Sequence, residues 1–230
     1  MELPPLQEGR LLRRHRRFLA DIQLADGSEV VAYCPNTGSL RTAGEPGSEV
    51  LLSWSTSPRR KTAWTWELVL SNGVWVGINT LLPNRLLALA IEAHWLPEFR
   101  GWSLDRREAR MGEHSRVDLL LRKGEKLCFL EIKNVTMVEE ETAFFPDAVT
   151  SRGSRHLREL EERVKQGHRA VMFFLIQRED GLALRPADSI DPTYGRTLRR
   201  AVAAGVEAIA YRAKVSPEAV ELVERVPVIL

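Results

Sequence analysis

The segment Ser115–Thr136 constrains the fold more than any other part of the chain, because it places charged side chains inside two apolar runs. Both runs have the length of a β-strand, and the turn around Gly124 between them is typical of a hairpin. Asp118 lies in the first run, and Glu131 and Lys133 lie in the second. Since alternate side chains of a strand share a face, we expect Glu131 and Lys133 to point the same way.

A hairpin that turns near Gly124 sets Asp118 opposite or diagonal to Glu131, so two carboxylates and one ammonium meet at the end of apolar strands. Burying such charges costs free energy unless they pair or bind a metal. Carboxylates hold Mg²⁺ in phosphoryl-transfer sites, where the metal activates water and polarises the phosphate. The cluster therefore predicts metal-assisted phosphodiester hydrolysis, with Mg²⁺ or Mn²⁺ held by Asp118 and Glu131, and with Lys133 orienting water or offsetting charge. The alternative is an ordinary ion-pair network.

The first third of the chain has the pattern of a small all-β domain. Short alternating or apolar segments are separated by turn signals such as Asp26-Gly27 and Asn72-Gly73. Five strands in so short a stretch predict a closed or nearly closed barrel, an architecture that often binds oligonucleotides. The expected strands are residues 18–24, 29–34, 49–54, 62–70 and 74–78.

Beyond Pro83-Asn84 the pattern changes to longer elements, which predicts a second domain. Strands and helices alternate after the hairpin, and this order indicates an α/β layout with parallel pairing. We therefore expect two domains, an all-β domain at 1–82 and an α/β domain at 83–230. The elements expected outside the hairpin are helices at 86–95, 154–166 and 193–204 and strands at 169–177 and 206–210.

Local charge says more about partners than the formal net charge of +2, which excludes neither a nucleic acid nor an acidic ligand. Aromatic rings interleaved with cations can stack bases while the cations follow phosphates. The alternative is that basic runs are solvated faces and that the rings fill the barrel core. The candidate nucleic-acid-binding residues in the first domain are Arg13, Arg14, Arg16, Arg17, Arg59, Arg60, Lys61, Trp64 and Trp66.

Cys34 and Cys128 are too few and too far apart in the chain for a disulfide framework or a cysteine-type zinc site. The N-terminal residues show no secretory signal, and no apolar stretch is long enough to span a bilayer. We therefore expect a cytoplasmic protein.

Several blocks along almost the whole chain are long and unusual. They read RRFLADI from Arg16, CPNTGSL from Cys34, RKTAWTWEL from Arg60, NTLLPN from Asn79, SRVD from Ser115, EIKNVT from Glu131, FPDAVTSRGSRHLREL from Phe145 and DP from Asp191. In these blocks the chain resembles the sugar fermentation stimulation protein A (SfsA) family. The resemblance implies an N-terminal OB-like barrel joined to a C-terminal domain of the PD-(D/E)XK nuclease type. It also implies largely sequence-non-specific DNA binding and a role in regulating sugar metabolism.

Carried over by position, the nuclease-like core of the family falls on Asp118, Glu131 and Lys133. Glu108, in EARMG, matches an acidic position before the hairpin and is a further candidate metal ligand. The chain departs from the family at Leu89, where members often have an acid in the first helix of this domain. If that acid is a ligand, the site here holds metal less tightly.

The block from Phe145, which belongs to the resemblance, supplies four further polar residues. Arg152 and His156 are candidate nucleic-acid-binding residues, and Asp147 and Thr150 are candidates for phosphate contacts or for support of the metal ligands.

Three functions remain open on the sequence. The first is a DNA-binding protein with a nuclease-type divalent-metal site that hydrolyses phosphodiesters. The second is a catalytically silent DNA-binding regulator linked to sugar metabolism. The third is a role without nucleic acid, in which the barrel binds a protein. A homodimer is compatible with each of them.

Overall fold

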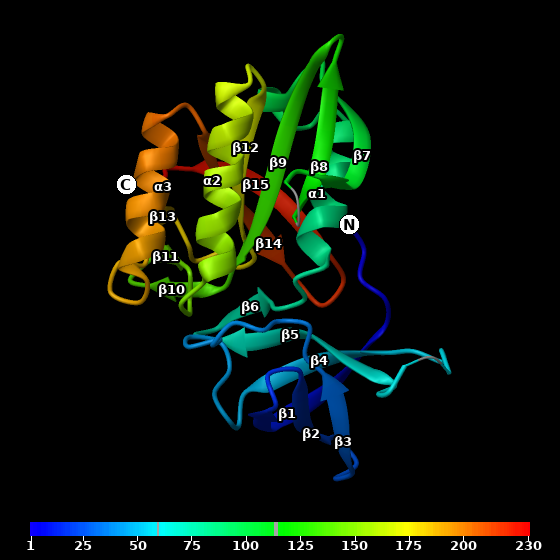
Figure 1. The fold of residues 1–230 in the computed structure, drawn as a ribbon. Coiled ribbons are helices and arrows are strands. Elements are labelled where there is room, and N and C mark those ends of the chain that lie inside the picture. Colours follow the sequence, from blue (N-terminus) through cyan, green and yellow to red (C-terminus); the bar gives the residue numbers. More distant parts are fainter. Residues whose placement is uncertain (59, 113–114) are drawn as a thin grey trace.

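The computed structural model describes residues 1–58, 60–112 and 115–230. A β-barrel formed by the first third of the chain lies against one end of a larger α/β domain (Figure 1). Among the described residues, no helix has the length and apolar character needed to cross a membrane.

The sheet that forms the barrel contains one strand more than the sequence predicted. Its strands are β1 (Leu6–His15), β2 (Leu19–Leu24), β3 (Glu29–Tyr33), β4 (Glu49–Trp54), β5 (Trp64–Ser71) and β6 (Val74–Gly77). They pair in the order β3-β2-β1-β4-β5-β6, and a parallel pairing of β3 with β5 closes β1 to β5 into a barrel. The expected five-stranded OB barrel is confirmed, although β1 replaces β6 as one of its five strands.

The second domain is built on a mixed six-stranded sheet with the order β15-β14-β12-β9-β8-β7. The hairpin is antiparallel, whereas β12 runs parallel to both β9 and β14, as the α/β layout predicted. The strands of this sheet are β7 (Ser103–Arg110), β8 (Arg116–Lys123), β9 (Lys126–Val135), β12 (Arg169–Ile176), β14 (Glu207–Val215) and β15 (Val220–Val226).

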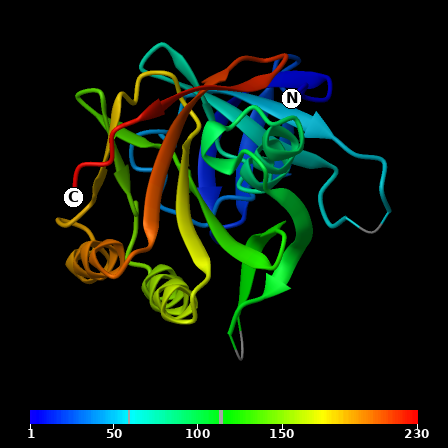
Figure 2. The ribbon, with the colours of Figure 1, turned by 90° about the horizontal axis from the view of Figure 1, so that it is seen from above.

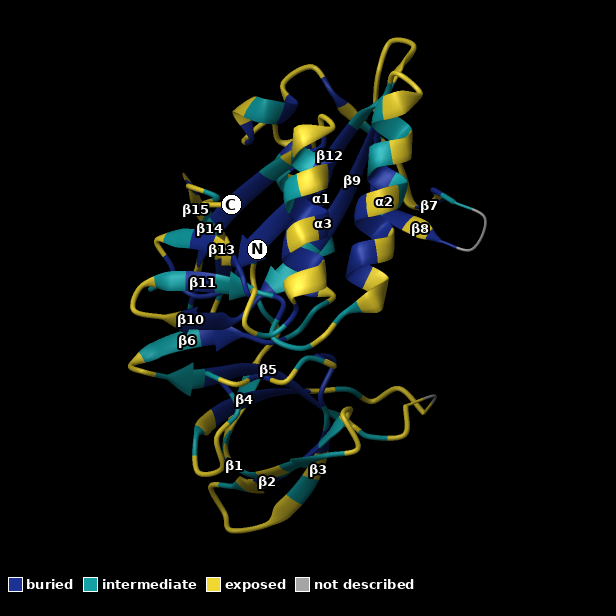
Figure 3. Cartoon of the chain, turned by 60° about the vertical axis from the view of Figure 1, so that its left-hand side comes forward, coloured by how far each residue is buried: buried dark blue, intermediate teal, exposed yellow. Residues whose placement is uncertain are grey.

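Helices cover both faces of this sheet, which is why its central strands are apolar throughout (Figures 2 and 3). On β12, Val171 and Phe173 pack with the residues of α1, whereas Met172 and Phe174 pack with those of α2 and α3. The helices are α1 (Leu82–Glu92), η1 (Pro97–Phe99), α2 (Ser151–Lys165) and α3 (Pro192–Ala203).

A small third sheet lies beside the large one. Its strands, in the order β10-β11-β13, are β10 (Met137–Glu139), β11 (Thr142–Phe145) and β13 (Ala183–Pro186). The sequence predicted neither these short strands nor the edge strands β7 and β15. The edge strands are largely exposed and polar, so they lack the apolar period of a half-buried strand.

The barrel shares its core and its hydrogen bonds with the α/β domain. Leu51 and Leu68 of the barrel pack in the same apolar cluster as α1 and the hairpin. The Gly77 amide donates to the Gln177 carbonyl at 2.8 Å. At the N-terminus the Leu3 amide donates to the Glu218 carbonyl at 2.8 Å, so the first residues pair with the α/β domain. The boundary after residue 82 stays a prediction.

Candidate metal and nucleic-acid site

The structure brings Asp118 and Glu131 together at the point where the hairpin strands separate. The β8–β9 ladder runs from Lys123↔Lys126 to Leu119↔Leu130 and then stops. Beyond it the Ile132 amide donates to Asp118 Oδ2 at 2.7 Å. The side chain of Asp118 therefore takes a backbone donor of β9, and the two acids meet on adjacent strands as the hairpin register predicted.

Glu131 is 3 % exposed and is held by two cationic or donor groups. Lys133 Nζ donates to Glu131 Oε1 at 2.6 Å, and His156 Nδ1 pairs with the same oxygen. Because Arg152 Nε donates to His156 Nε2 at 3.3 Å, the proton of the neutral ring lies on Nδ1 and is donated to Glu131. Burial raises the pKa of Glu131, but Lys133 and His156 outweigh burial and bring this pKa below its ordinary value.

One oxygen of Glu131 is left for a further ligand. Glu131 Oε2 is buried and has no hydrogen-bond partner among the described residues. Such an atom costs free energy unless a water or a cation satisfies it. Together with the ionised state of this carboxylate, the free oxygen fits a hard divalent cation.

Asp118 has the opposite electrostatic balance. Burial, and then repulsion by Glu131, raise its pKa from 3.8 to about 6. The Ile132 amide and the Lys133 ammonium oppose this rise, as does Asn84 Nδ2, which donates to Asp118 Oδ1 at 2.8 Å. The raised pKa means that Lys133 and the two hydrogen bonds do not fully compensate the charged form of Asp118, and a bound cation would add the missing positive charge.

Replacement of Asp118 by asparagine is expected to stabilise the metal-free protein by about 1–3 kcal/mol at about pH 8. The folded state holds the Asp118 proton more tightly than the unfolded state, so stability falls as pH rises from 3.8 to about 6. Above that window the neutral amide of the variant avoids the cost of a desolvated charge beside Glu131, and below about pH 4 the two proteins should converge. Urea unfolding across this range measures the difference. A difference that does not change with pH would contradict the raised pKa.

Glu108, predicted as a further metal ligand, lies on β7, the strand next to β8. The β7–β8 register pairs Arg107 with Leu119 and Ala109 with Val117, so Glu108 is level with Asp118. It is exposed, lines the same cavity and makes no hydrogen bond or ion pair with any described residue. As the described side chains stand, no group of three or more His, Cys, Asp or Glu residues is arranged to hold a metal ion. A role for Glu108 as a ligand stays a prediction.

Leu89, where the sequence departs from the family pattern, lies away from Asp118 and Glu131. Leu89 is 48 % exposed on α1 and is not among the residues that line the cavity. The residue of α1 that reaches the acids is Asn84, in the first turn, which was not among the predicted site residues. Its place in the block NTLLPN, at the start of the helix, was the available signal.

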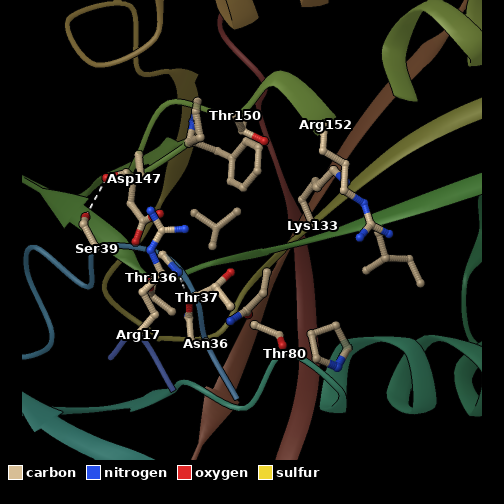
Figure 4. A pocket seen from close by; sticks show the side chains of 18 of the residues that line it. Arg17, Asn36, Thr37, Ser39, Thr80, Lys133, Thr136, Asp147, Thr150 and Arg152 are labelled. Carbon is tan, nitrogen blue, oxygen red and sulfur yellow. Dashed lines mark hydrogen bonds between the residues drawn. The ribbon is translucent and has the colours of Figure 1, made fainter. Parts of the chain in front are cut away.

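A cavity of about 1010 Å³ lies over the cluster, between the barrel and the α/β domain. Figure 4 shows that its walls come from both domains, with Arg17 and Thr37 on the barrel and Lys133 and Arg152 opposite. Its lining is more polar than apolar and includes four acids, and it also carries the cations that a phosphate-binding site requires, namely Arg14, Arg16, Arg17, Lys133 and Arg152.

The predicted cations divide according to whether they reach this cavity. Arg16, Arg17 and Arg152 line it and are exposed. Arg14 also lines it, but its guanidinium donates to the Gly38 carbonyl at 2.6 Å and to the carbonyls of Asn36 and Arg17. Arg14 is therefore occupied in holding loop backbone.

The other predicted cations lie outside the cavity. Arg13 pairs with Asp21 at 2.6 Å on the barrel surface. Arg60 and Lys61 are exposed in the loop between β4 and β5. Arg59 lies outside the described residues.

The prediction that Trp66 stacks on bases is wrong. Trp64 and Trp66 do share a strand face, but that face is the barrel interior, where both pack with Leu52. Trp66 is fully buried and its Nε1 donates to the Leu68 carbonyl at 2.9 Å. Trp64 is half-buried, and its neighbour on β4, Trp54, is the exposed ring of this region.

His156 is likewise not a direct nucleic-acid contact, because it is 1 % exposed. Its two ring nitrogens form hydrogen bonds with Glu131 and Arg152, so His156 orients Glu131, the candidate metal ligand. Sequence alone did not connect His156 to Glu131, because they lie on different elements.

Asp147 and Thr150 are structural. Asp147 Oδ2 accepts the Leu40 amide at 2.9 Å, and this contact ties the α/β domain to the barrel. Thr150 caps α2, because its Oγ1 accepts the Gly153 amide at 3.0 Å.

Comparison with known proteins gives consistent results over the whole chain. Residues 12–78 match the family model described as the SfsA N-terminal OB domain. Residues 81–219 match the model described as the sugar fermentation stimulation protein RE domain. A sugar fermentation stimulation protein homolog of Geobacter sulfurreducens is 57 % identical over 230 residues, covering 100 % of this chain and 99 % of the relative. The homolog of Geobacter metallireducens is 58 % identical over 232 residues, with 100 % of both chains covered.

A solved structure is similar over the same length. It is that of Pyrococcus furiosus SfsA in complex with Ca²⁺, which aligns with a TM-score of 0.93 and 29 % identity. The alignment covers 100 % of this chain and 98 % of that one.

Proposed function

Because the chain belongs to the sugar fermentation stimulation protein A (SfsA) family, we propose that it binds DNA in the cavity and hydrolyses phosphodiesters at a divalent-metal site. The observation that carries the proposal is a buried, ionised Glu131 with one oxygen unpartnered among the described residues, beside an Asp118 whose charge is only partly compensated. Both acids line a cavity to which Arg16, Arg17, Lys133 and Arg152 bring positive charge.

Asp118 and Glu131 are the residues that would hold Mg²⁺ or Mn²⁺, with Glu108 as a further candidate. Both acids present the oxygen ligands that these hard cations take, and the Ca²⁺ in the Pyrococcus furiosus structure is a cation of the same kind. A bound cation of this type lowers the pKa of a water molecule and stabilises the charge that develops on the phosphate.

The chain's own residues act on position and charge. His156 and Lys133 hold Glu131 Oε1, which leaves Oε2 free to take a ligand. Lys133 also places a positive charge next to where phosphate oxygens would lie. Asn84 and the Ile132 amide fix the orientation of Asp118.

DNA affinity and cleavage test the proposal together. We expect affinity to fall steeply with salt, since phosphate contacts release counterions, and we expect Arg16→Gln/Arg17→Gln to reduce the salt slope by about 1–2. Arg60→Gln/Lys61→Gln, outside the cavity, is the matched control.

Plasmid and labelled strands should be cut in Mg²⁺ or Mn²⁺ and left intact in EDTA.

Two results would separate the alternatives. Salt-dependent binding without cleavage in either metal would favour a catalytically silent DNA-binding regulator, for which the ion pairs of Glu131 provide a structural role. Affinity that does not weaken as salt rises would contradict binding led by phosphate contacts.

A further inference from the structure

Two apolar side chains are exposed in the cavity that contains the acids. Leu81 is 66 % exposed and Val149 is 76 % exposed, and both line the cavity. Single exposed apolar residues are common on protein surfaces. These two differ because they are the exposed large apolar side chains of the described lining, in which Phe144 and Phe145 are half-buried. They therefore add a contact that phosphates do not need.

Hydrogen-bonded turns hold both side chains in place. The Leu81 amide donates to Asn79 Oδ1 at 3.0 Å just before α1 begins. Val149 directly precedes Thr150, whose amide donates to Asp191 Oδ2 at 2.8 Å. These contacts hold the backbone at Leu81 and next to Val149 in the conformation that leaves both side chains exposed in the cavity.

The cavity is a poor match for an intact duplex. Glu131 is 3 % exposed, so a phosphate must descend between barrel and α/β domain to approach its free oxygen. A duplex is stiff over this length, and its second strand would have to pass the cavity walls. An unpaired strand is flexible and presents its bases on the side away from the phosphates.

The Arg16–Arg17 turn supplies the phosphate contacts of this arrangement. Both residues have positive φ, 50° and 62°, which side chains other than glycine rarely adopt. Arg17 reaches from the barrel into the cavity (Figure 4), and neither arginine pairs with a described carboxylate. The backbone of this turn is also fixed, since Arg14 donates to the Arg17 carbonyl at 3.0 Å.

Resting on the proposed function, we infer that the cavity takes an unpaired DNA strand, with its phosphates against Arg16, Arg17 and Arg152 and at least one base against Leu81 and Val149. A duplex would enter only at a frayed end or through a single-stranded tail. Contact of bases with an apolar surface does not read their hydrogen-bonding edges, so sequence preference should be weak.

Fluorescence anisotropy with a labelled strand of about 20 nucleotides tests this inference, because that length exceeds the site of one OB domain. The strand is measured alone, as a blunt duplex and as a duplex with a single-stranded tail, in EDTA so that nothing is cut. We expect the single strand and the tailed duplex to bind at least about tenfold more tightly than the blunt duplex. Leu81→Ser/Val149→Ser should weaken single-strand binding about tenfold and change duplex binding less than about twofold.

Leu182→Ser/Val223→Ser is the matched control, since both residues are partly exposed and neither lines the cavity. Equal affinity for the blunt duplex and the single strand would overturn the inference, as would an equal loss of both affinities in the Leu81 and Val149 variant. If the blunt duplex and the single strand bind equally well and the blunt duplex is cut, the proposed function stands and only the preference for an unpaired strand is contradicted. Absence of binding to every DNA would instead contradict the proposed function.

Discussion

Glu131→Gln is expected to lower metal-dependent DNA cleavage by at least about a thousandfold. The substitution removes the charge that would hold the cation and weakens the hold of Lys133 and His156 on this side chain. Loss of a bound metal removes several kcal/mol of transition-state stabilisation, and each 1.36 kcal/mol is about tenfold in rate. Gel assays of plasmid nicking in Mg²⁺ and Mn²⁺ measure the loss.

Two further variants make this result interpretable. Glu162→Gln changes an exposed carboxylate on α2 and should keep full activity. Asp118→Asn should lose cleavage to a similar extent while the metal-free protein becomes more stable at about pH 8, so unfolding cannot explain its inactivity. Cleavage above about a tenth of the wild-type rate in both acid variants would rule out this pair of carboxylates as the site.

Trp66→Ala is expected to cost about 3–5 kcal/mol of unfolding free energy. The ring is fully buried in the barrel core, and the smaller side chain leaves a cavity and removes the indole hydrogen bond to the Leu68 carbonyl. Urea unfolding, followed by tryptophan fluorescence and circular dichroism, measures this change.

Trp54→Ala is the matched control, because this ring on the neighbouring strand is 59 % exposed and should contribute under about 1 kcal/mol. Trp66→Phe, which keeps most of the packing, should leave DNA affinity unchanged. Weaker DNA binding in Trp66→Phe without a loss of stability would revive a stacking role for this residue.

The sequence predicted that Asp118 and Glu131 meet, because a hairpin is a local structure. A turn near Gly124 and the alternation of side chains along each strand were enough to predict that Asp118 lies next to Glu131. In the structure the two acids lie on adjacent strands. The same reasoning did not find His156 or Asn84, which reach the site from helices distant in the chain. Contacts of that kind depend on how the helices pack on the sheet, and the spacing of apolar residues along the sequence does not determine this packing.

The strand face that carries Trp64 and Trp66 shows what the alternation of side chains along a strand cannot predict. A period of two placed Trp64 and Trp66 together, but it does not say whether their face is the inside or the outside of a barrel. β5 is buried on both sides, because the α/β domain covers the outer face that carries Leu68. A register shift in the β4–β5 pairing, between Leu51 and Leu52, moves Leu68 to that outer face, although a strict period of two would place it with Trp66.

Strand β1 was missed for a related reason. Of its ten residues only Leu11 is buried, and the arginines of the strand dominate its composition. The arginines of this segment therefore indicate a basic surface patch and hide the strand, which pairs with both β2 and β4.

The position of a divalent ion tests the proposed metal site most directly. A crystal soaked in Mn²⁺ and measured at an energy where manganese scatters anomalously should show a peak within coordination distance of both Asp118 and Glu131 Oε2. The peak should disappear in Glu131→Gln and persist in the Glu162→Gln control. Occupied manganese sites elsewhere, with none between these two carboxylates, would contradict the proposal.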